Sequence, residues 1–554
     1  MIWTMPVAPL GNAIFAALAA ALPVVLLFLA LVVLGWKAPG AGLLAAGSAA
    51  AVAVAAFGMP LPFAFLAAVH GVLYGLVPIG AIVVAAVFLQ DVATATGSFG
   101  RLRDALSRAT SDRALQALLI AFGFGALLEG SAGFGAPVAI SAGILVGLGF
   151  PALPAAGLCL LANTVPVAFA AVGLPIAALG QATGLPEWQL GAATARLLAP
   201  LAVAVPFVLV LRAATGRVSS RAFGAALAAG LAFSVTQLLV AENLGPQLPA
   251  LAGALAAIVA LLPFVRSSWA HVGREALAGA APFLTLALLV SAWSLPPVRS
   301  LLSRTTPVVP IPLLHFGIVD SSRGLALPAT WSVPWLSGAA TAILLAALLS
   351  AAFGGLGARE TGRLLGSTTR RLLPTIGAVS AFLAFASIAT YSGMMSALGR
   401  ALAASGGAFP LLSPAIGWIG VLMTGSDTAS NAVFGRLQIT TAAEVGMPAA
   451  LAAAANTVGG TAGKMVSPQS IAVACAACGL TGREGELLRR AMPLSLTLCG
   501  LVALLTFATA QLAPGLVPGP GPVAAPQVAG PAVGVGVLGL SIVLAALVAR
   551  LGRR

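Results

Sequence analysis

Apolar runs long enough to cross a lipid bilayer follow one another along this sequence and limit what it can fold into. A helix needs about 20 mainly apolar residues to span the hydrocarbon core. The 554-residue chain is 60% hydrophobic and only 7% charged, whereas a soluble domain has about 25% charged residues. No soluble fold could bury this much apolar surface, and short alternating strands typical of a membrane β-barrel do not occur. The sequence therefore predicts an all-α polytopic membrane protein.

The positive charge of the chain lies mainly in short connections between the apolar runs. The formal net charge is +14, but cytoplasmic loops of membrane proteins are enriched in arginine and lysine, so this charge does not indicate a nucleic-acid partner. Placing the basic connections in the cytoplasm predicts an N-terminus outside the cell and a cytoplasmic C-terminus. The basic connections are residues 101–113, 212–221, 266–274, 359–371 and 483–490, with the tail from Arg550.

The charge pattern predicts about 13 transmembrane helices plus two re-entrant hairpins. Blocks 115–149 and 407–435 must each enter the membrane and return to the same side, because a single crossing would misplace the later basic connections. A Pro-rich loop, 295–335, then lies outside. The expected spans include residues 15–36, 62–90, 152–181, 190–211, 223–241, 247–265, 275–294, 336–354, 373–397, 448–480, 491–512 and 533–550.

The chain also repeats itself in register. The matching pairs are ANTV at 162–165 and 455–458, Pro175 and Pro468, Arg196 and Arg489, all at one offset, and LLEGS at 127–131 with LMTGS at 422–426 after a short slip. The two copies face opposite ways in the predicted topology, and such inverted repeats are the common plan of secondary transporters. The predicted organisation is N-terminal scaffold spans 1–90, a first repeat 91–212, connecting spans and external loop 213–335, a second inverted repeat 336–512, and a C-terminal linker with the last span 513–554.

The segment GSAGFGAP, residues 130–137, is predicted to form the tip of the first hairpin. Glycines allow sharp turns and close approach, and Pro137 suits the first turn of a new helix. The second half-helix would point free N–H groups at an anion. A Gly-rich packing face of a straight helix is the alternative, but it leaves Glu129 unexplained. The residues expected to bind substrate here are Gly130, Ser131, Gly133 and Gly135.

Polar side chains gather in the second hairpin and downstream of both hairpins. The second hairpin, 424–435, is predicted to form a hydrated site, with a polar surface loop as the alternative. The two Asn-Thr pairs lie in segments where Gly and Pro would unwind the helices, and broken helices that meet near the midplane form the usual substrate cavity. The substrate-binding residues expected here are Ser426, Thr428, Ser430, Asn431, Asn163, Thr164, Asn456, Thr457, Lys464 and Ser467.

Ionisable residues at membrane depth are rare and usually functional. Buried carboxylates can take up and release protons, so Glu129 and Asp427 are the predicted proton-coupling residues. Lys464 could neutralise a substrate carboxylate, or form a structural ion pair with either acid. Asp91 and His70 are weaker candidates, and His70 is more simply a satisfied core residue.

No set of residues indicates an enzyme, a metal site or a cofactor. The chain has no HExxH, no P-loop and no GxSxG with partners, and its GFGALLEG segment lacks a βαβ context. Cys475 and Cys478 lie in an apolar run and are interpreted as small apolar filler. Without a nucleotide-binding module, transport would be driven by an ion gradient.

The same segments resemble the L-lactate permease family. They are LLEGSAGFGAPVAI (127–140), GLCLLANTVPVAFAAVGLPI (157–176), TGSDTASNAVFGRLQ (424–438) and ANTVGGTAGKMVSPQSIAVA (455–474). The resemblance implies import of lactate, and often glycolate, with protons through the bacterial inner membrane. It also implies an elevator-like transporter, usually a homodimer, in which two hairpins and two broken helices move against a scaffold. Sodium-coupled carboxylate transport, of the dicarboxylate type, is the alternative, and a passive channel is a third reading.

Overall fold

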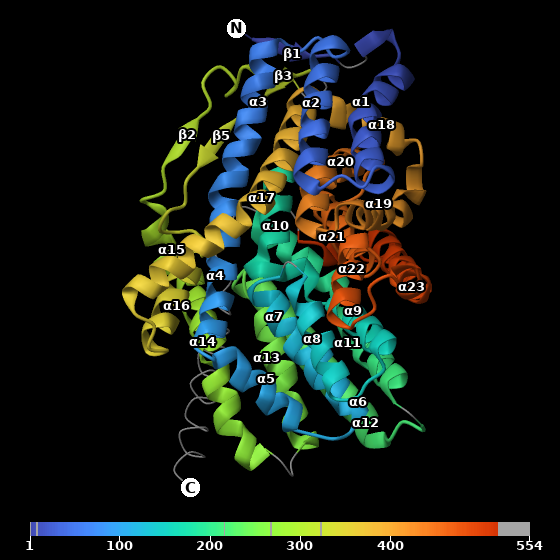
Figure 1. Ribbon diagram of the computed structural model, residues 1–554. Coiled ribbons are helices and arrows are strands. Elements are labelled where there is room, and N and C mark those ends of the chain that lie inside the picture. Colours follow the sequence, from blue (N-terminus) through green and yellow to red (C-terminus); the bar gives the residue numbers. More distant parts are fainter. Residues whose placement is uncertain are drawn as a thin grey trace.

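The computed structural model describes residues 2–6, 9–133, 135–214, 216–265, 269–321 and 324–518. Most of this chain is helical (Figure 1). Within the described ranges ten helices are long and apolar enough to cross a membrane, and the count rises to 11 if one bent pair is a single span. The expected last span, 533–550, and most of the linker before it lie outside the described residues.

One group of helices packs around α17, the longest described helix. Helix α17 contacts α2, α3 and α4, while α14 contacts α5 and α16. Many of the buried positions in this group are alanines, such as Ala41, Ala45 and Ala49 of α2, which allow close helix packing. The group comprises α1 (Ala13–Phe28), α2 (Ala38–Ala55), α3 (Leu61–Tyr74), α4 (Ala81–Ala95), α5 (Ser98–Arg108), α14 (Trp269–Ser294), α16 (Ala339–Phe353) and α17 (Ala358–Tyr391).

A second group contains both sequence repeats. In each repeat two helices joined by a tight turn precede a broken helix pair and a long helix. The first repeat comprises α6 (Arg113–Gln116), η4 (Ala117–Phe124), α7 (Gly125–Ser131), α8 (Ala136–Gly147), α9 (Ala152–Asn163), η5 (Val167–Phe169), α10 (Ala170–Thr183) and α11 (Glu187–Ala213). The second comprises α19 (Phe409–Thr424), α20 (Asp427–Val445), α21 (Ala449–Lys464), α22 (Pro468–Ala477) and α23 (Glu484–Leu512). Helices α12 (Ser220–Asn243), α13 (Pro249–Leu261) and α18 (Met394–Ala403) pack against them.

The block 113–149 turns back on itself. Arg113 at its start donates a 3.2 Å hydrogen bond to the carbonyl of Gly149 at its end, and α8 packs against η4 and α7. Residues 114–131 are all buried within the protein. Protein therefore surrounds the turn after Ser131, as irregular backbone at membrane depth requires.

The block 409–445 turns back in the same way, since α19 and α20 pack along each other. Phe409 at its start and Ala442 near its end belong to one buried apolar cluster.

The Pro-rich segment 295–335 contains regular secondary structure and is not only a loop. It holds α15 (Pro296–Ser303) and strands β2 (Val308–Pro310), β3 (Ile318–Asp320), β4 (Leu325–Ala326) and β5 (Thr330–Ser332).

These strands form two small sheets, so the fold is not purely α-helical as the sequence suggested. Strand β1 (Trp3–Met5), at the N-terminus, pairs in parallel with β3, and β3 pairs antiparallel with β4. Strand β2 pairs antiparallel with β5. Figure 1 shows the two sheets at the end of the molecule where the N-terminus lies and along its side. Valine, isoleucine and threonine between prolines and glycines favour such short strands.

Within the described residues, several of the expected spans are shorter or divided, and this has a physical reason. Helices α13 and α16, placed where two spans were expected, are among the shorter apolar helices. The expected span 448–480 is divided into α21 and α22 by the break before Pro468. The expected span 152–181 bends by 57° between α9 and α10. Hydropathy reports apolar length, but it does not report where a helix ends inside an apolar run.

Candidate functional site

The turn of the first hairpin is built by glycines in left-handed conformations. Gly133 has φ +65° and Gly135 has φ +83°, a region that residues with a side chain rarely adopt. Helix α8 then begins with Pro137 in its first turn, where the missing N–H costs nothing. The N-terminal turn of α8 consequently presents backbone N–H groups at the turn, as the sequence predicted.

Glu129, on α7 just before this turn, is fully buried and has two partners from other segments. Asn163 Nδ2, at the end of α9, donates a 2.9 Å hydrogen bond to Glu129 Oε2. Lys464 Nζ, at the end of α21, lies 3.5 Å from Glu129 Oε1. The ion pair therefore joins the first hairpin to the broken helix of the second repeat, and the amide fixes the other carboxylate oxygen.

Asp427 is the opposite case, because it is 2% exposed and neither carboxylate oxygen has a hydrogen-bond partner among the described residues. It is the first residue of α20, after the N-cap Ser426, whose hydroxyl accepts from the N–H of Ala429. A Cβ on Gly460 of α21 would lie 2.4 Å from Asp427 Oδ1, so the glycine makes room for the carboxylate.

The two asparagines of the second repeat, Asn431 and Asn456, belong to one buried network of hydrogen bonds. Asn431 Oδ1 accepts hydrogen bonds from Asn456 Nδ2 at 2.9 Å and from Thr457 Oγ1 at 3.0 Å. Asn456 Oδ1 accepts from Gln438 Nε2 at 3.0 Å. Asn431 Nδ2 donates to the carbonyl of Pro175, 3.0 Å away. This last bond ties the hairpin of the second repeat to the broken helix of the first.

A cavity of about 260 Å³ lies between these segments and receives residues from both repeats. Lys464, Glu129 and Asp427 all line it, and so do Gly135, the N-cap of α8, and the first turns of α20 and α22. Its polar lining comprises Glu129, Thr375, Thr424, Ser426, Asp427, Thr428, Lys464, Gln469 and Ser470, with Gly133, Gly135 and Gly425 at the turns. A cation and several helix N-termini around one small cavity are suited to a small anion.

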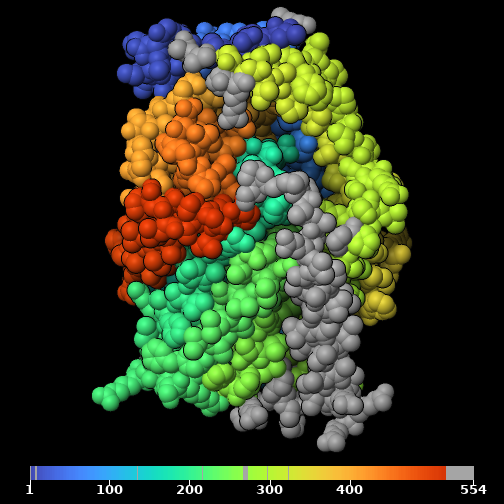
Figure 2. All heavy atoms as spheres, turned by 180° about the vertical axis from the view of Figure 1, so that it is seen from behind, coloured from blue at the N-terminus to red at the C-terminus, as the bar shows by residue number. Residues whose placement is uncertain are grey.

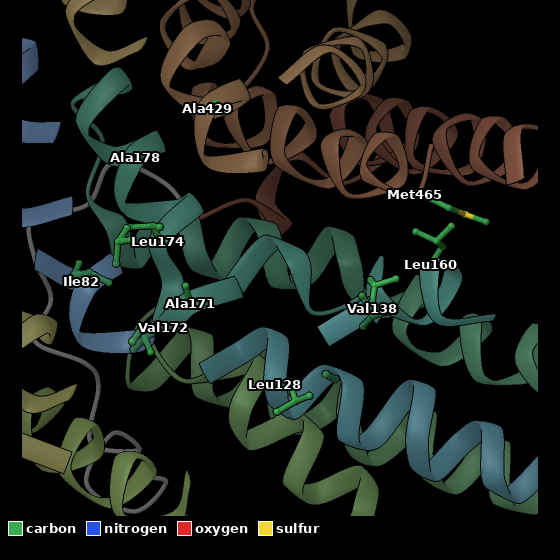
Figure 3. Close-up of a cluster of buried hydrophobic side chains, with 14 of the residues drawn as sticks. Ile82, Leu128, Val138, Leu160, Ala171, Val172, Leu174, Ala178, Ala429 and Met465 are labelled. Carbon is green, nitrogen blue, oxygen red and sulfur yellow. The ribbon is translucent and has the colours of Figure 1, made fainter. Parts of the chain in front are cut away.

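Apolar side chains hold the first hairpin and the broken helix in place. Figure 3 shows Leu128 and Val138 of the hairpin, Val172 and Leu174 of α10 and Met465 after α21 among the buried side chains of this region. Ala171, Val172 and Gly173 all have positive φ (44°, 57° and 80°). These angles interrupt the helix near the start of α10, where Ala170 and Ala171 line the cavity.

The predicted site residues divide into those on the cavity and those behind it. The predicted residues that line the cavity are Glu129, Gly133, Gly135, Ser426, Asp427, Thr428 and Lys464. The predicted residues that are outside its lining are Gly130, Ser131, Asn163, Thr164, Ser430, Asn431, Asn456, Thr457 and Ser467. Several of the second set bond back to their own helix; the hydroxyl of Ser131, for example, donates to the carbonyl of Leu128.

Sequence reasoning missed several residues of this region. Gln438 and Ser413 belong to the buried network of hydrogen bonds, and Gln469 and Ser470 line the cavity. Gln438 is the last residue of the TGSDTASNAVFGRLQ motif. Its polar side chain, so close to the other polar residues of that hairpin, could have identified it. Ser413 lies on the apolar helix α19, and nothing in the sequence around it indicated a role.

The glycines of the second broken helix act differently from the expectation. Helix α21 runs unbroken to Lys464, so Gly459 and Gly463 do not unwind it. A Cβ on Gly459 would lie 2.0 Å from the carbonyl oxygen of Pro414, and one on Gly463 would lie 2.3 Å from that of Trp418. These glycines allow α21 to pack backbone against backbone on α19, and the break comes after Lys464.

Two weaker candidates lie away from this cavity. Asp91 accepts from Arg371 Nη2 at 2.7 Å and from the hydroxyl of Thr368 at 2.5 Å, so it joins α4 to α17. His70 contacts Ser387 and the Thr330 carbonyl in a second cavity. The four cysteines are buried and free, in agreement with their interpretation as apolar filler.

Known proteins similar to this chain decide its family. The family model described as L-lactate permease matches residues 16–513. The chain belongs to the L-lactate permease family. Glycolate permease GlcA of Escherichia coli (strain K12) is 41% identical, over 93% of this chain and 99% of the relative. L-lactate permeases of Bacillus subtilis (strain 168) and E. coli K12 are 40% and 38% identical, over 92% and 93% of this chain and 98% and 100% of theirs.

Membership of the family, together with the ten or 11 apolar helices, makes this chain a multi-pass membrane protein. Among solved structures, the YdaH transporter of Alcanivorax borkumensis covers 81% of this chain and 88% of its own, with a TM-score of 0.44 and 18% identity. That similarity is too low to transfer an architecture, so the interpretation of the site rests on the contacts within this chain.

Proposed function

We propose that this chain is a proton-coupled symporter that imports lactate and related 2-hydroxymonocarboxylates, such as glycolate, through the bacterial inner membrane. The relatives named as L-lactate and glycolate permeases support the substrate class. The observation that carries the proposal is the cavity of about 260 Å³ in which Lys464, Glu129 and Asp427 meet helix N-termini from both repeats.

The charges around the cavity explain why an anion would need a proton. Lys464 and Glu129 form an ion pair and together contribute no net charge. Asp427 adds a negative charge whenever it is ionised, and no described residue donates a hydrogen bond to it. Burying an unpaired carboxylate is costly, and burying two is worse. A proton on Asp427 would therefore offset the arrival of the substrate carboxylate.

This assigns different roles to the two predicted proton-coupling acids. Asp427 would carry the proton, since its carboxylate accepts no hydrogen bond from any residue that the structure describes. Glu129 would hold Lys464 in position, since both its oxygens are occupied. The substrate carboxylate would then bind between Lys464 and the N-terminal turns of α8 and α20. Ser426 and Thr428, which line the cavity, would contact the substrate hydroxyl.

The two groups of helices fit an elevator cycle. The second group, which holds both hairpins and both broken helices, would carry the cavity as a unit past the group around α17. The hydrogen bond from Asn431 to the carbonyl of Pro175 ties the repeats together within this unit. The inverted relation of the repeats, an outside N-terminus, a cytoplasmic C-terminus and a homodimer are parts of the same proposal.

The test uses the purified chain in liposomes with an inward proton gradient and no sodium. We expect labelled L-lactate to accumulate above its equilibrium level, and a protonophore to abolish the accumulation. Uptake that needs sodium would contradict the coupling and favour the sodium-coupled carboxylate alternative. Uptake that never exceeds equilibrium would contradict symport.

A further inference from the structure

A second cavity, of about 310 Å³, lies apart from the one described above. It is formed by α3, α10, α17, α20 and residues 327–330 of the segment between β4 and β5. Figure 2 shows the molecule hollowed on this face between the yellow-green segment near residue 320 and the orange segment near residue 420. The cavity lies between the group that holds the repeats and the group around α17.

The two cavities follow each other along the same three helices. Residues 374–382 of α17 contribute to the first cavity and residues 383–391 to the second. On α10 the corresponding stretches are 170–175 and 180–184. On α20 the first turn lines the first cavity, and Arg436 lines the second.

Tight packing of α10 on α20 separates the two cavities. A Cβ on Gly435 would lie 2.9 Å from Leu179 Cδ1 and 3.3 Å from Ala182 Cβ. Leu179 is fully buried. A solute in the second cavity is therefore close to the first one, but it is not in contact with Lys464.

The chemistry of the second cavity suits a carboxylate. Arg436 and His70 line it, and none of the described residues that line it is acidic. Its hydroxyl groups belong to Tyr74, Tyr391, Ser387, Thr390, Thr183 and Thr330. An arginine fork binds carboxylates well, and the hydroxyls can satisfy the hydroxyl of a 2-hydroxy acid.

The groups that line this cavity are held in place by the backbone around them. Tyr391 donates a 2.8 Å hydrogen bond to the carbonyl of Pro328, and Tyr74 donates one of 3.0 Å to that of Thr330. Arg436 Nη1 donates to the carbonyl of Thr183 at 3.4 Å. The cavity is thus a preformed polar site whose walls come from both groups of helices.

We infer that this second cavity is a separate binding station for small hydroxycarboxylates, centred on Arg436, next to the site that carries the substrate. The inference rests on the proposed function for its substrate class. A cationic cleft raises the local concentration of an anion, by about tenfold or more. The station would therefore lower the substrate concentration needed for half-maximal uptake without changing the transport step.

The test detects occupancy of the station without relying on transport. Gln181→Cys places one accessible thiol in the station, since the four native cysteines are buried. The rate of its modification by a small anionic methanethiosulfonate is measured in the purified full-length chain, with and without L-lactate. Ser303→Cys, at an exposed position on α15, reports any general effect of lactate on the reagent.

We expect L-lactate to protect Gln181→Cys, and to protect it equally when Glu129→Gln and Lys464→Met are added together, a change that disables the first cavity without leaving a buried charge unpaired. Adding Arg436→Gln should raise the lactate concentration for half-protection at least tenfold, and Arg436→Lys should restore part of it. Arg400→Gln on α18 makes the same charge change outside both cavities and should leave protection unchanged.

Two results would contradict the inference that the second cavity binds hydroxycarboxylates. One is the absence of protection in the Gln181→Cys chain, and the other is protection that disappears when Glu129→Gln and Lys464→Met are added together, because the first cavity would then explain it. Failure of the proposed function gives a different result, namely no lactate accumulation by the unmodified chain in liposomes.

Discussion

The two hairpins occupy equivalent places in the repeat, but they are chemically different. Glu129 in the first corresponds to Thr424 in the second, whereas Asn163 and Asn456 are the same residue in both. Asn163 donates to the Glu129 carboxylate. Asn456 belongs to a neutral chain of amides with Asn431 and Gln438. Asn163 therefore stabilises a buried charge, whereas Asn456 stabilises contacts between uncharged side chains.

The comparison also explains why all the charge gathers in one cavity. The repeat counterparts of Asp427 and Lys464 are Ala132 and Ala171, neither of which is ionisable. Each repeat supplies what the other lacks, and the ion pair between Glu129 and Lys464 crosses from one to the other. The duplicated framework thus surrounds one asymmetric cluster of charged side chains.

The largest effect is expected from breaking the ion pair between the repeats. Lys464→Met should abolish lactate uptake and lower the free energy of unfolding by about 3–5 kcal/mol, because Glu129 stays buried without its cation. Adding Glu129→Gln should recover most of that stability but no uptake. Thermal unfolding of the detergent-purified variants measures the stability. A double variant as unstable as Lys464→Met alone would contradict the pairing.

The next effect separates the two carboxylates. Asp427→Asn should keep downhill lactate exchange and lose accumulation driven by a proton gradient, because the proton carrier is gone. Stability should be retained, since no hydrogen bond to a described residue is lost. Glu129→Gln should instead impair exchange itself, because it frees Lys464. If accumulation survives Asp427→Asn, the assignment of the proton to Asp427 is wrong.

A third pair of variants compares the two asparagines. Asn456→Ala removes two buried hydrogen bonds, one accepted by Asn431 Oδ1 and one donated by Gln438 Nε2, and should cost about 1–3 kcal/mol in total. Its loss of uptake should follow its loss of folded protein. Asn163→Ala removes one hydrogen bond, so it should cost less stability while raising the half-maximal lactate concentration. Equal stability losses for the two variants would contradict this difference in the roles of the two asparagines.

The smallest effect concerns the two equivalent serines at the hairpin turns. Ser426→Ala removes the N-cap of α20 and should lower the free energy of unfolding by about 1 kcal/mol. Ser131→Ala removes a hydroxyl that only donates back to its own helix, so its effect should stay within about 0.5 kcal/mol. Unfolding midpoints of the two variants measure the difference, and a reversed order would contradict the capping role.

The sequence predicted the hairpin turns because their signals are local. Glycines followed by Pro137 identify a chain reversal and a helix start, and Gly133 and Gly135 have the positive φ that the turn needs. The same local reasoning was wrong for Gly459 and Gly463. A glycine that turns the chain and a glycine that admits a neighbouring helix look alike in sequence, and only the position of α19 distinguishes them.

Membership of the membrane class, the sequence repeat and the set of polar residues within the apolar runs were determined by the sequence alone, because hydropathy, register and composition are properties of the chain itself. The tertiary structure alone decided that Glu129, rather than Asp427, pairs with Lys464, and that Asn456 lies behind the cavity. The ion pair depends on how two segments 335 residues apart pack together. Partners so far apart in the chain are chosen by the packing of the helices, and no local pattern encodes that choice.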